Sequence, residues 1–97
     1  MTDMVPTNNA IEGVVDDMAR LNITWAGDNG DMPDLVPFTA SDDELKRMAA
    51  EAVQSGYIPG IAADEGVDLS DFVVDRFAAT EHTSNSIFIR PKTPFGR

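Results

Sequence analysis

The stretch LVPFTASDDELKRMAAEAVQSG, residues 35–56, decides the fold of this chain. Its first five residues, 35–39, are mostly apolar or β-branched and predict a short strand. Ser41 is followed three residues later by Glu44, the pattern of a capping box. In that motif the serine hydroxyl accepts from the glutamate N–H, and the glutamate carboxylate accepts from the serine N–H. The stretch therefore predicts a strand that leads directly into a helix over about residues 42–55.

An apolar stripe continues the helical signal. Gly56 follows the stripe, and glycine is common just past a helix because it reaches the left-handed conformation without steric cost. Ala40 and Leu45 hold the positions of a hydrophobic staple. The three acidic residues 42–44 fall in the first turn, where negative charge suits the positive end of the helix dipole. The stripe recurs at intervals of three and four residues and consists of Leu45, Met48, Ala49, Ala52 and Val53.

A β-hairpin is predicted before the helix. Residues 21–26 alternate apolar and polar side chains, which is the period of a half-buried strand. Residues 27–34 are almost entirely Gly, Asp, Asn and Pro and predict a wide loop. The hairpin then pairs residues 21–26 with residues 35–39. Because proline has no N–H to donate to a ladder, Pro37 indicates that the second strand lies at a sheet edge.

A second hairpin is predicted after the helix. The chain first makes an apolar turn over residues 57–61 and an acidic loop over residues 62–71, with a short helical turn around Leu69. Residues 72–77 and 86–90 are rich in apolar and β-branched side chains and predict two strands. These two strands most simply pair with each other.

The two ends of the chain give weaker patterns. Residues 1–9 contain a proline and two asparagines and predict a flexible N-terminus. Residues 10–21 favour a short extra helix or turn by their apolar spacing, whereas the β-branched pair Val14-Val15 also fits an extended strand. Residues 91–97 contain two prolines and a glycine and predict an extended C-terminal tail. The length of 97 residues indicates that residues 1–97 form a single domain.

The element order strand, strand, helix, strand, strand predicts an α+β fold in which the helix packs on a mixed sheet. This order resembles the β-grasp fold of ubiquitin-like proteins. A strand that runs into residues 41–43 and then a helix resembles the strand-to-helix junction of that family. Residues 56–59 resemble the Gly-Ile-Pro after its helix, and residues 69–71 resemble a Leu-Ser-Asp before a late turn. A final strand followed by Arg90 and a glycine near the C-terminus resembles a modifier tail. The resemblance covers about residues 20–97.

The resemblance implies a non-enzymatic, ubiquitin-like protein-binding module, with a modifier or carrier acting through its C-terminal tail as one form. Conjugated modifiers and sulfur carriers end in Gly-Gly, whereas this chain ends in Phe95-Gly96-Arg97. The resemblance therefore implies a ubiquitin-like shape better than it implies conjugation to a target. The implied partner is an activating enzyme or a peptidase. An extended tail can add to a partner's sheet edge or enter a groove. The candidate tail residues are Arg90, Lys92, Phe95, Gly96 and Arg97.

The charge distribution favours a second class of function. The formal net charge is −10, and residues 1–45 hold ten acids against one arginine. Nucleic-acid binding needs cations facing the phosphates, so this balance argues against a nucleic-acid partner. It favours a small acidic accessory or inhibitory protein, of the kind that phages and mobile elements encode, that binds a basic protein surface. Mimicry of nucleic-acid charge and simple solubility are the other interpretations. The candidate acidic surface is Asp16, Asp17, Asp42, Asp43 and Glu44.

The residue types needed for catalysis are sparse. The chain has no cysteine, and its single histidine, His82, lies in the polar segment 80–86, where a solvated loop residue is favoured over a general base. The acidic turns at residues 28–31 and 64–68 lack the EF-hand spacing, and no phosphate-binding glycine motif is present. We therefore expect no enzyme activity, no catalytic residue, no cofactor and no metal ligand.

Two aromatic residues and the overall hydropathy complete the sequence predictions. Trp25 and Phe38 fall on predicted strands and are expected in the core rather than as binding anchors. There is no apolar run of about 18 residues, so no membrane span is predicted. The first residues lack a secretory signal pattern, and a cytoplasmic protein is expected. A third hypothesis, a structural assembly subunit, rests on small size alone.

Overall fold

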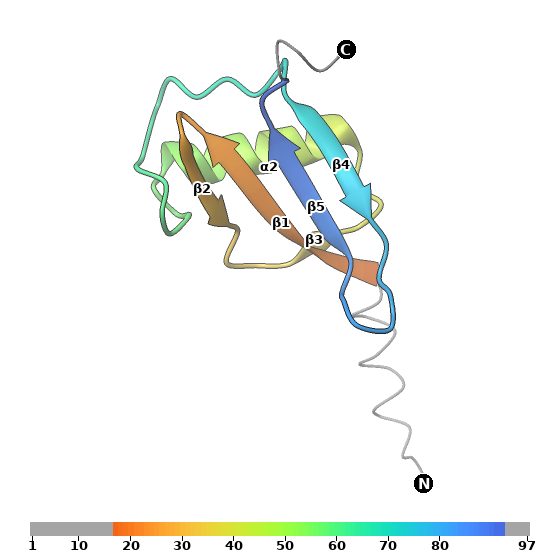
Figure 1. Ribbon diagram of the computed structural model, residues 1–97. Helices are drawn as coiled ribbons and strands as arrows, with labels where there is room; N and C mark the ends of the chain where they lie inside the picture. The colour runs from red at the N-terminus through yellow and green to blue at the C-terminus, as the bar shows by residue number, and fades with distance from the viewer. Residues whose placement is uncertain (1–16, 93–97) are drawn as a thin grey trace, which may run out of the picture.

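Within the described residues, a mixed five-stranded sheet packs against one helix, Asp42–Gln54 (Figure 1). The elements of the computed structural model, which describes residues 17–92, are β1 (Met18–Trp25), β2 (Asp28–Asp31), β3 (Val36–Pro37), α2 (Asp42–Gln54), β4 (Val73–Phe77) and β5 (Ser86–Arg90). The order across the sheet is β2-β1-β5-β4, and β3 pairs with β1 off this path. β1 and β5 are parallel neighbours, and α2 crosses one face of the sheet (Figure 1). No element within residues 17–92 covers the other face, which we call the open face.

The predicted α+β class is confirmed, but five strands are present, and three of them precede the helix. The region 27–34, predicted as a wide loop, contains β2. β2 follows β1 through Ala26 and Gly27, whose φ values of 54° and 86° suit a two-residue hairpin turn. The loop prediction was wrong because the sequence of β2, Asp-Asn-Gly-Asp, has no apolar side chain to mark a strand.

β2 is held by side-chain amides on one face and by close packing on the other. Asn22 Nδ2 donates to Asn29 Oδ1 at 3.0 Å and to Asp31 Oδ1 at 2.8 Å. On the opposite face, Gly30 meets the turn that follows α2, and a Cβ atom there would lie 2.3 Å from the carbonyl oxygen of Pro59. Glycine is therefore required at this position by the approach of another backbone segment.

β3 is shorter than the strand predicted over residues 35–39 and does not close the predicted hairpin with residues 21–26. It pairs antiparallel with Met18 and Ala19 at the start of β1, whereas β2 pairs with the rest of that strand. Within the described residues β1 is the one paired neighbour of β3, so Pro37 lies at an edge, as predicted.

β1 begins at Met18, so residues 18–21 of the extra helix or turn predicted over residues 10–21 form a strand instead. The local helical spacing was misleading because the central residues of β1 pair in parallel with β5, far away in the sequence. The predictions for residues 1–9, 10–16 and 93–97 fall outside the described residues.

α2 carries both predicted caps. Ser41 Oγ accepts from the Glu44 N–H at 3.1 Å, and Glu44 Oε1 accepts from the Ser41 N–H at 3.1 Å. At the other end Gly56 has a φ of 72°, and the N–H groups of Gly56 and Tyr57 donate back to the last turn at 3.1 and 2.9 Å. These two bonds form a Schellman motif, which satisfies carbonyls that the end of a helix leaves unpaired.

The core lies between α2 and the inner face of the sheet. Alternate residues of β1 and β5 point toward the helix, and the apolar stripe predicted on α2 faces them. The side chains of Ile58 and Ile61 close the core from the predicted apolar turn. The fully buried side chains of greatest volume are Leu21, Ile23, Leu45, Val53, Ile58, Ile87 and Ile89.

The region after the helix follows the prediction with one exception. β4 and β5 pair antiparallel and confirm the second hairpin. The helical turn predicted around Leu69 is instead a reverse turn that is closed by the Phe72 N–H donating to the Leu69 carbonyl at 2.9 Å. Leu69 is buried and serves as a core residue at this turn.

Candidate protein-binding surfaces

The open face of the sheet carries an aromatic pair on β4 and β5. Phe88 alternates with the buried residues Ile87 and Ile89, so it lies on the face away from α2, and Phe77 shares this face. The two rings meet edge to face, with centroids 5.6 Å apart and planes at 76°. Phe77 is 57% exposed. The pair is therefore a large apolar feature that faces solvent.

Polar side chains surround this aromatic pair. Arg90 Nε donates to Asp75 Oδ2 at 2.7 Å, and a second nitrogen of the guanidinium contacts the same oxygen. On the β1–β2 side, Asn29 Nδ2 donates to Thr24 Oγ1 at 3.0 Å, beside the amide ladder described above. The open face is thus aromatic with paired charges on the β4–β5 half and amide-rich on the β1–β2 half.

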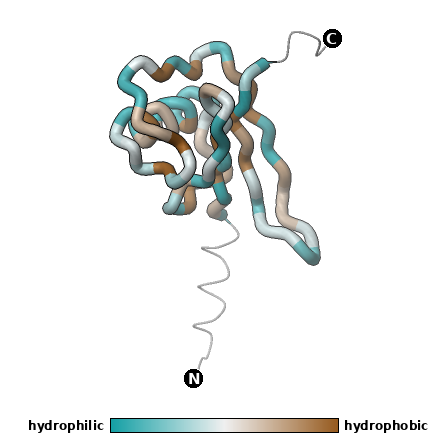
Figure 2. The backbone as a smooth tube through the Cα atoms, turned by 60° about the vertical axis from the view of Figure 1, so that its left-hand side comes forward, coloured by the Kyte–Doolittle hydropathy of each residue, from teal (hydrophilic) through white to brown (hydrophobic). Residues whose placement is uncertain are grey.

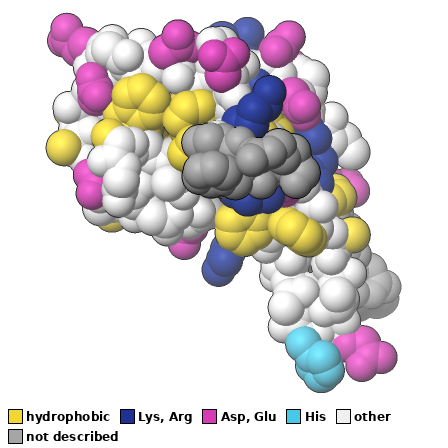
Figure 3. All heavy atoms as spheres, turned by 45° about the horizontal axis from the view of Figure 1, so that its top comes forward, with side chains coloured by type: hydrophobic (Ala, Val, Ile, Leu, Met, Phe, Trp, Pro, Cys, Tyr) yellow, Lys and Arg dark blue, Asp and Glu magenta, His cyan; other side chains and the backbone are white. Residues whose placement is uncertain are grey.

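The loop between β4 and β5 is hydrophilic and extends beyond the body of the fold (Figure 2). The chain's one histidine lies at its outer end (Figure 3). The side chain of His82 is 88% exposed, with Nε2 3.9 Å from Glu81 Oε1, and Arg20 and His82 flank a shallow hollow of about 320 Å³. The position of His82 agrees with the predicted solvated loop residue.

A second exposed apolar surface lies between α2 and the segment that joins β2 to β3, around a hollow of about 340 Å³. Leu35 and Tyr57, each 48% exposed, line it, and its carboxylates belong to Asp34 and Glu51. No Lys, Arg or His is among its lining residues in the described chain. We call this hollow the acidic groove; its remaining apolar lining comes from Met32, Val36, Met48 and Ala52.

A hydrogen bond within the acidic groove ties the end of α2 to the β2–β3 segment. The Tyr57 hydroxyl donates to Asp34 Oδ2 at 2.6 Å. This bond to the carboxylate, and then the repulsion between the two negative charges, raise the pKa of Tyr57 above its usual value of 10.0. The tyrosine therefore stays neutral and hydrogen-bonded well into alkaline pH.

The predicted tail residues are only partly described. Arg90 is the last residue of β5, and its ion pair with Asp75 makes it part of the sheet. Lys92 is exposed after the end of the strand. Phe95, Gly96 and Arg97 lie outside the described residues, and the predicted role of the tail stays a prediction.

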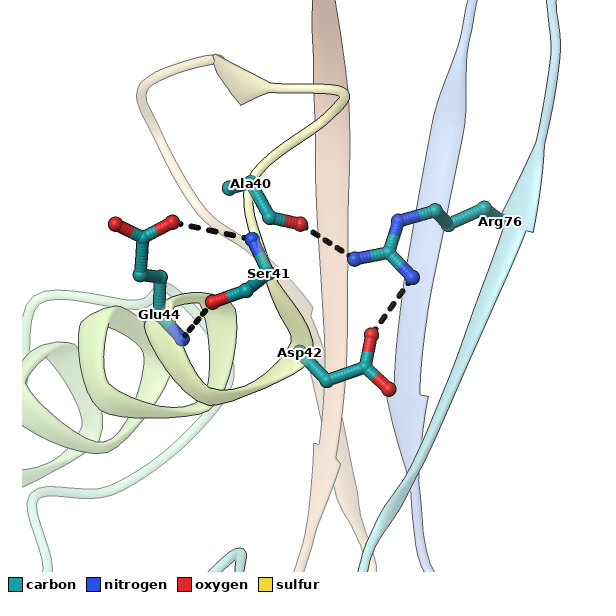
Figure 4. A network of polar contacts seen from close by, with 5 residues as sticks. All are labelled: Ala40, Ser41, Asp42, Glu44 and Arg76. Atoms are coloured by element: carbon teal, nitrogen blue, oxygen red, sulfur yellow. Dashed lines mark hydrogen bonds and ion pairs between the residues drawn. The ribbon is translucent and has the colours of Figure 1, made fainter.

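The predicted acidic surface is divided by the local structure of the helix start (Figure 4). Asp42 Oδ1 accepts from Arg76 Nη1 of β4 at 2.7 Å, and the Glu44 carboxylate closes the capping box. Acidic side chains are spread around the view in Figure 3 and do not gather in one patch there. Of the other predicted acids, Asp17 and Asp43 are exposed, and Asp16 lies outside the described residues.

Trp25 and Phe38 both pack partly buried against the core, as the sequence predicts. Trp25 Nε1 donates to Asp64 Oδ2 at 2.8 Å, and its ring centroid lies 5.7 Å from that of Phe72. These contacts fasten the long loop after α2 to the end of β1, so Trp25 has a structural role.

The side chains that sequence reasoning missed are the exposed apolar residues of the two surfaces. Phe77 could have been found from the hairpin pattern, because residues two apart along a strand lie on the same face of the sheet. This alternation places Phe77 on the open face. Leu35 and Tyr57 carry no such local signal, since their proximity depends on how the end of α2 approaches the β2–β3 segment.

No model of a known protein family, no curated protein and no solved structure matches this chain. Within residues 17–92, no three His, Asp or Glu side chains gather where they could hold a metal ion. In the same part of the chain, no helix has the length and apolar character needed to cross a bilayer. The functional inference therefore rests on the two surfaces themselves.

Proposed function

We propose that this protein is a non-enzymatic protein-binding module with a ubiquitin-like β-grasp fold. The sheet supports this fold: the first and last long strands pair in parallel at its centre, and each has an antiparallel hairpin partner on its outer side. One capped helix crosses a single face of the sheet. β3 is a short addition at the edge of this arrangement.

The observation that carries the proposed function is the exposed aromatic pair. Large aromatic side chains supply much of the binding energy at protein interfaces, and they lose little conformational entropy there. Phe88 is half-buried and braces Phe77, so the exposed ring is held in place before a partner arrives. The ion pair of Arg90 with Asp75 supplies a polar rim beside it.

The proposal favours binding over catalysis because of the position of His82. A catalytic imidazole needs a nucleophile or substrate within hydrogen-bond reach and a site that excludes water. The side chain of His82 is 88% exposed at the end of a projecting loop, and its ion-pair contact is the equally exposed Glu81. This environment supports a solvated residue.

Affinity capture with the full chain as bait tests the proposed function. Proteins bound from an extract of the source cells are quantified for the wild type, for Phe77→Ala and for the control Glu81→Gln in the β4–β5 loop. We expect the capture of a specific partner to fall about tenfold with Phe77→Ala and to stay unchanged with the control. Equal capture by all three folded variants, checked by circular dichroism, would contradict the role of the open face.

A modifier or carrier that acts through its C-terminal tail is one form of this proposal. Its partner would be an activating enzyme or a peptidase. Deleting residues 95–97 is expected to abolish adenylation or conjugation by a cognate activating enzyme, because Gly96 would be lost and the chain would end in the carboxylate of Pro94. Unchanged reaction of the shortened chain would rule out this form and leave the binding module.

A second candidate function, an acidic accessory or inhibitory protein, is supported by the net charge of −10 and by the exposed acids Asp17 and Asp43. The partner in this case presents a basic surface. We expect reversal of the two exposed acids Asp17 and Asp43 to lysine to weaken binding and to reduce its salt dependence. Binding that withstands both high salt and this double reversal would contradict the second candidate.

A further inference from the structure

The acidic groove shares no lining residue with the aromatic pair of the open face. It is built by α2, by Tyr57 just after it and by the β2–β3 segment, whereas the aromatic pair belongs to β4 and β5. Each of the two surfaces can therefore be altered without touching the other.

The groove has an apolar floor and adaptable sides. Val36 and Ala52 are buried beneath it, and Leu35 stands 48% exposed. Its two methionines, Met32 and Met48, are half-buried, and methionine adjusts its shape easily because its side chain is unbranched and flexible. The volume of about 340 Å³ suits one or two large side chains rather than a whole protein surface.

The charges of the groove select the occupant. Asp34 and Glu51 are exposed at it, and none of the ion pairs within residues 17–92 involves either of them. With a net charge of −10 on the chain, an acidic occupant would be repelled, and a cation would meet two carboxylates without a competing base among the groove residues.

We propose that the acidic groove docks a short linear segment of a partner protein in which an apolar anchor is next to a lysine or arginine. The anchor enters beside Leu35 and Tyr57, and the basic side chain faces Asp34 and Glu51. This inference deepens the proposed protein-binding function by naming the partner's chemistry, and it rests on that class of function but not on the aromatic pair.

A random peptide library displayed on phage, selected against the full chain, supplies the probe. We expect the selected peptides to place lysine or arginine beside an apolar residue. A synthetic peptide of that consensus should shift the amide NMR signals of Leu35, Glu51 and Tyr57. Leu35→Ala and Glu51→Lys should each weaken the peptide about tenfold, and Glu51→Lys should also reduce the salt dependence.

Matched variants make the test specific. Phe77→Ala removes an exposed apolar side chain from the open face, and Glu81→Lys makes the same charge change as Glu51→Lys in the β4–β5 loop. Both controls should leave the peptide affinity unchanged. Since Phe77→Ala reports on the open face and Leu35→Ala reports on the groove, failure of one proposal is distinguishable from failure of the other.

Several outcomes would overturn the inference. The selection could recover no peptide above background, or the selected peptides could lack basic residues. The peptide could also shift NMR signals of β4 and β5 alone. A dimer that Leu35→Ala dissociates in analytical ultracentrifugation would assign the groove to a second copy of the chain. Shifts of the groove signals on deletion of residues 1–16 or 93–97 would assign it to the chain's own ends.

Discussion

The two faces of the sheet come from the same strands but have opposite environments. Toward α2, Leu21, Ile23, Ile87 and Ile89 have no exposed surface. On the other face, Phe88 is half-buried, Phe77 is 57% exposed, and the amides of β1 and β2 bond to one another. Because side chains alternate along a strand, one set of residues builds the core and the next set lies on the face away from the helix.

The largest expected effect comes from breaking the inner face. Ile23→Ala removes a fully buried side chain and should lower the free energy of unfolding by about 2–5 kcal/mol, measured by urea denaturation. The matched change Phe77→Ala on the open face should cost only about 0.5 kcal/mol. A similar decrease in the free energy of unfolding for the two variants would show that the open face also contributes to stability.

A smaller loss of stability is expected at Gly30, where the turn after α2 packs against the inner face of the sheet. A Cβ atom at Gly30 would lie 2.3 Å from the Pro59 carbonyl oxygen and 2.8 Å from Ile58 Cγ2, so Gly30→Ala should lower the free energy of unfolding by about 1–3 kcal/mol. Gly66→Ala is the control, because the nearest neighbour of an added Cβ atom there, Asp64 Oδ1, would lie 3.4 Å away. Equal stability of both variants would contradict the close approach of the turn to β2.

The start of the covering helix gives the next effect. Ser41→Ala removes the hydroxyl that accepts from the Glu44 N–H and should lower the free energy of unfolding by about 1 kcal/mol. Glu44→Gln keeps an oxygen that can accept from the Ser41 N–H and should cost less. A thermal melt of each variant measures the difference, and a larger loss for Glu44→Gln would indicate that charge matters more than the cap.

The smallest effect concerns the acidic groove and appears at alkaline pH. The folded-state pKa of Tyr57 is raised above 10.0, so the contribution of the neutral hydroxyl to stability is full below pH 10.0 and is lost as pH rises through the folded pKa. Tyr57→Phe should therefore show a shallower loss of stability above this pH than the wild type.

The absorbance of the tyrosinate gives the pKa directly, because Tyr57 is the only tyrosine in the chain. Asp34→Asn removes the charge that opposes ionisation and should lower the pKa of Tyr57 toward its usual value. An unchanged titration in this variant would contradict the hydrogen bond between Tyr57 and Asp34.

The predictions that succeeded rest on signals confined to a few neighbouring residues. Ser41 and Glu44 specify the start of α2, Gly56 its end, and the apolar and β-branched side chains of residues 72–77 and 86–90 the second hairpin. The candidate site was less accessible to prediction. Two of the three acids at the helix start are engaged, Asp42 in an ion pair with Arg76 of β4 and Glu44 in the capping box. Leu35 and Tyr57 were not singled out.

The sequence by itself determined the α+β class, the capped helix and the β4–β5 hairpin, because capping, periodicity and turn chemistry act over a few residues. Only the tertiary structure decided that 18–21 is a strand, that the polar segment 28–31 pairs with residues 22–25, and that an acidic groove forms beside Tyr57. These features depend on contacts between distant segments: the parallel ladder to β5, the approach of Pro59 to Gly30 and the bond from Tyr57 to Asp34.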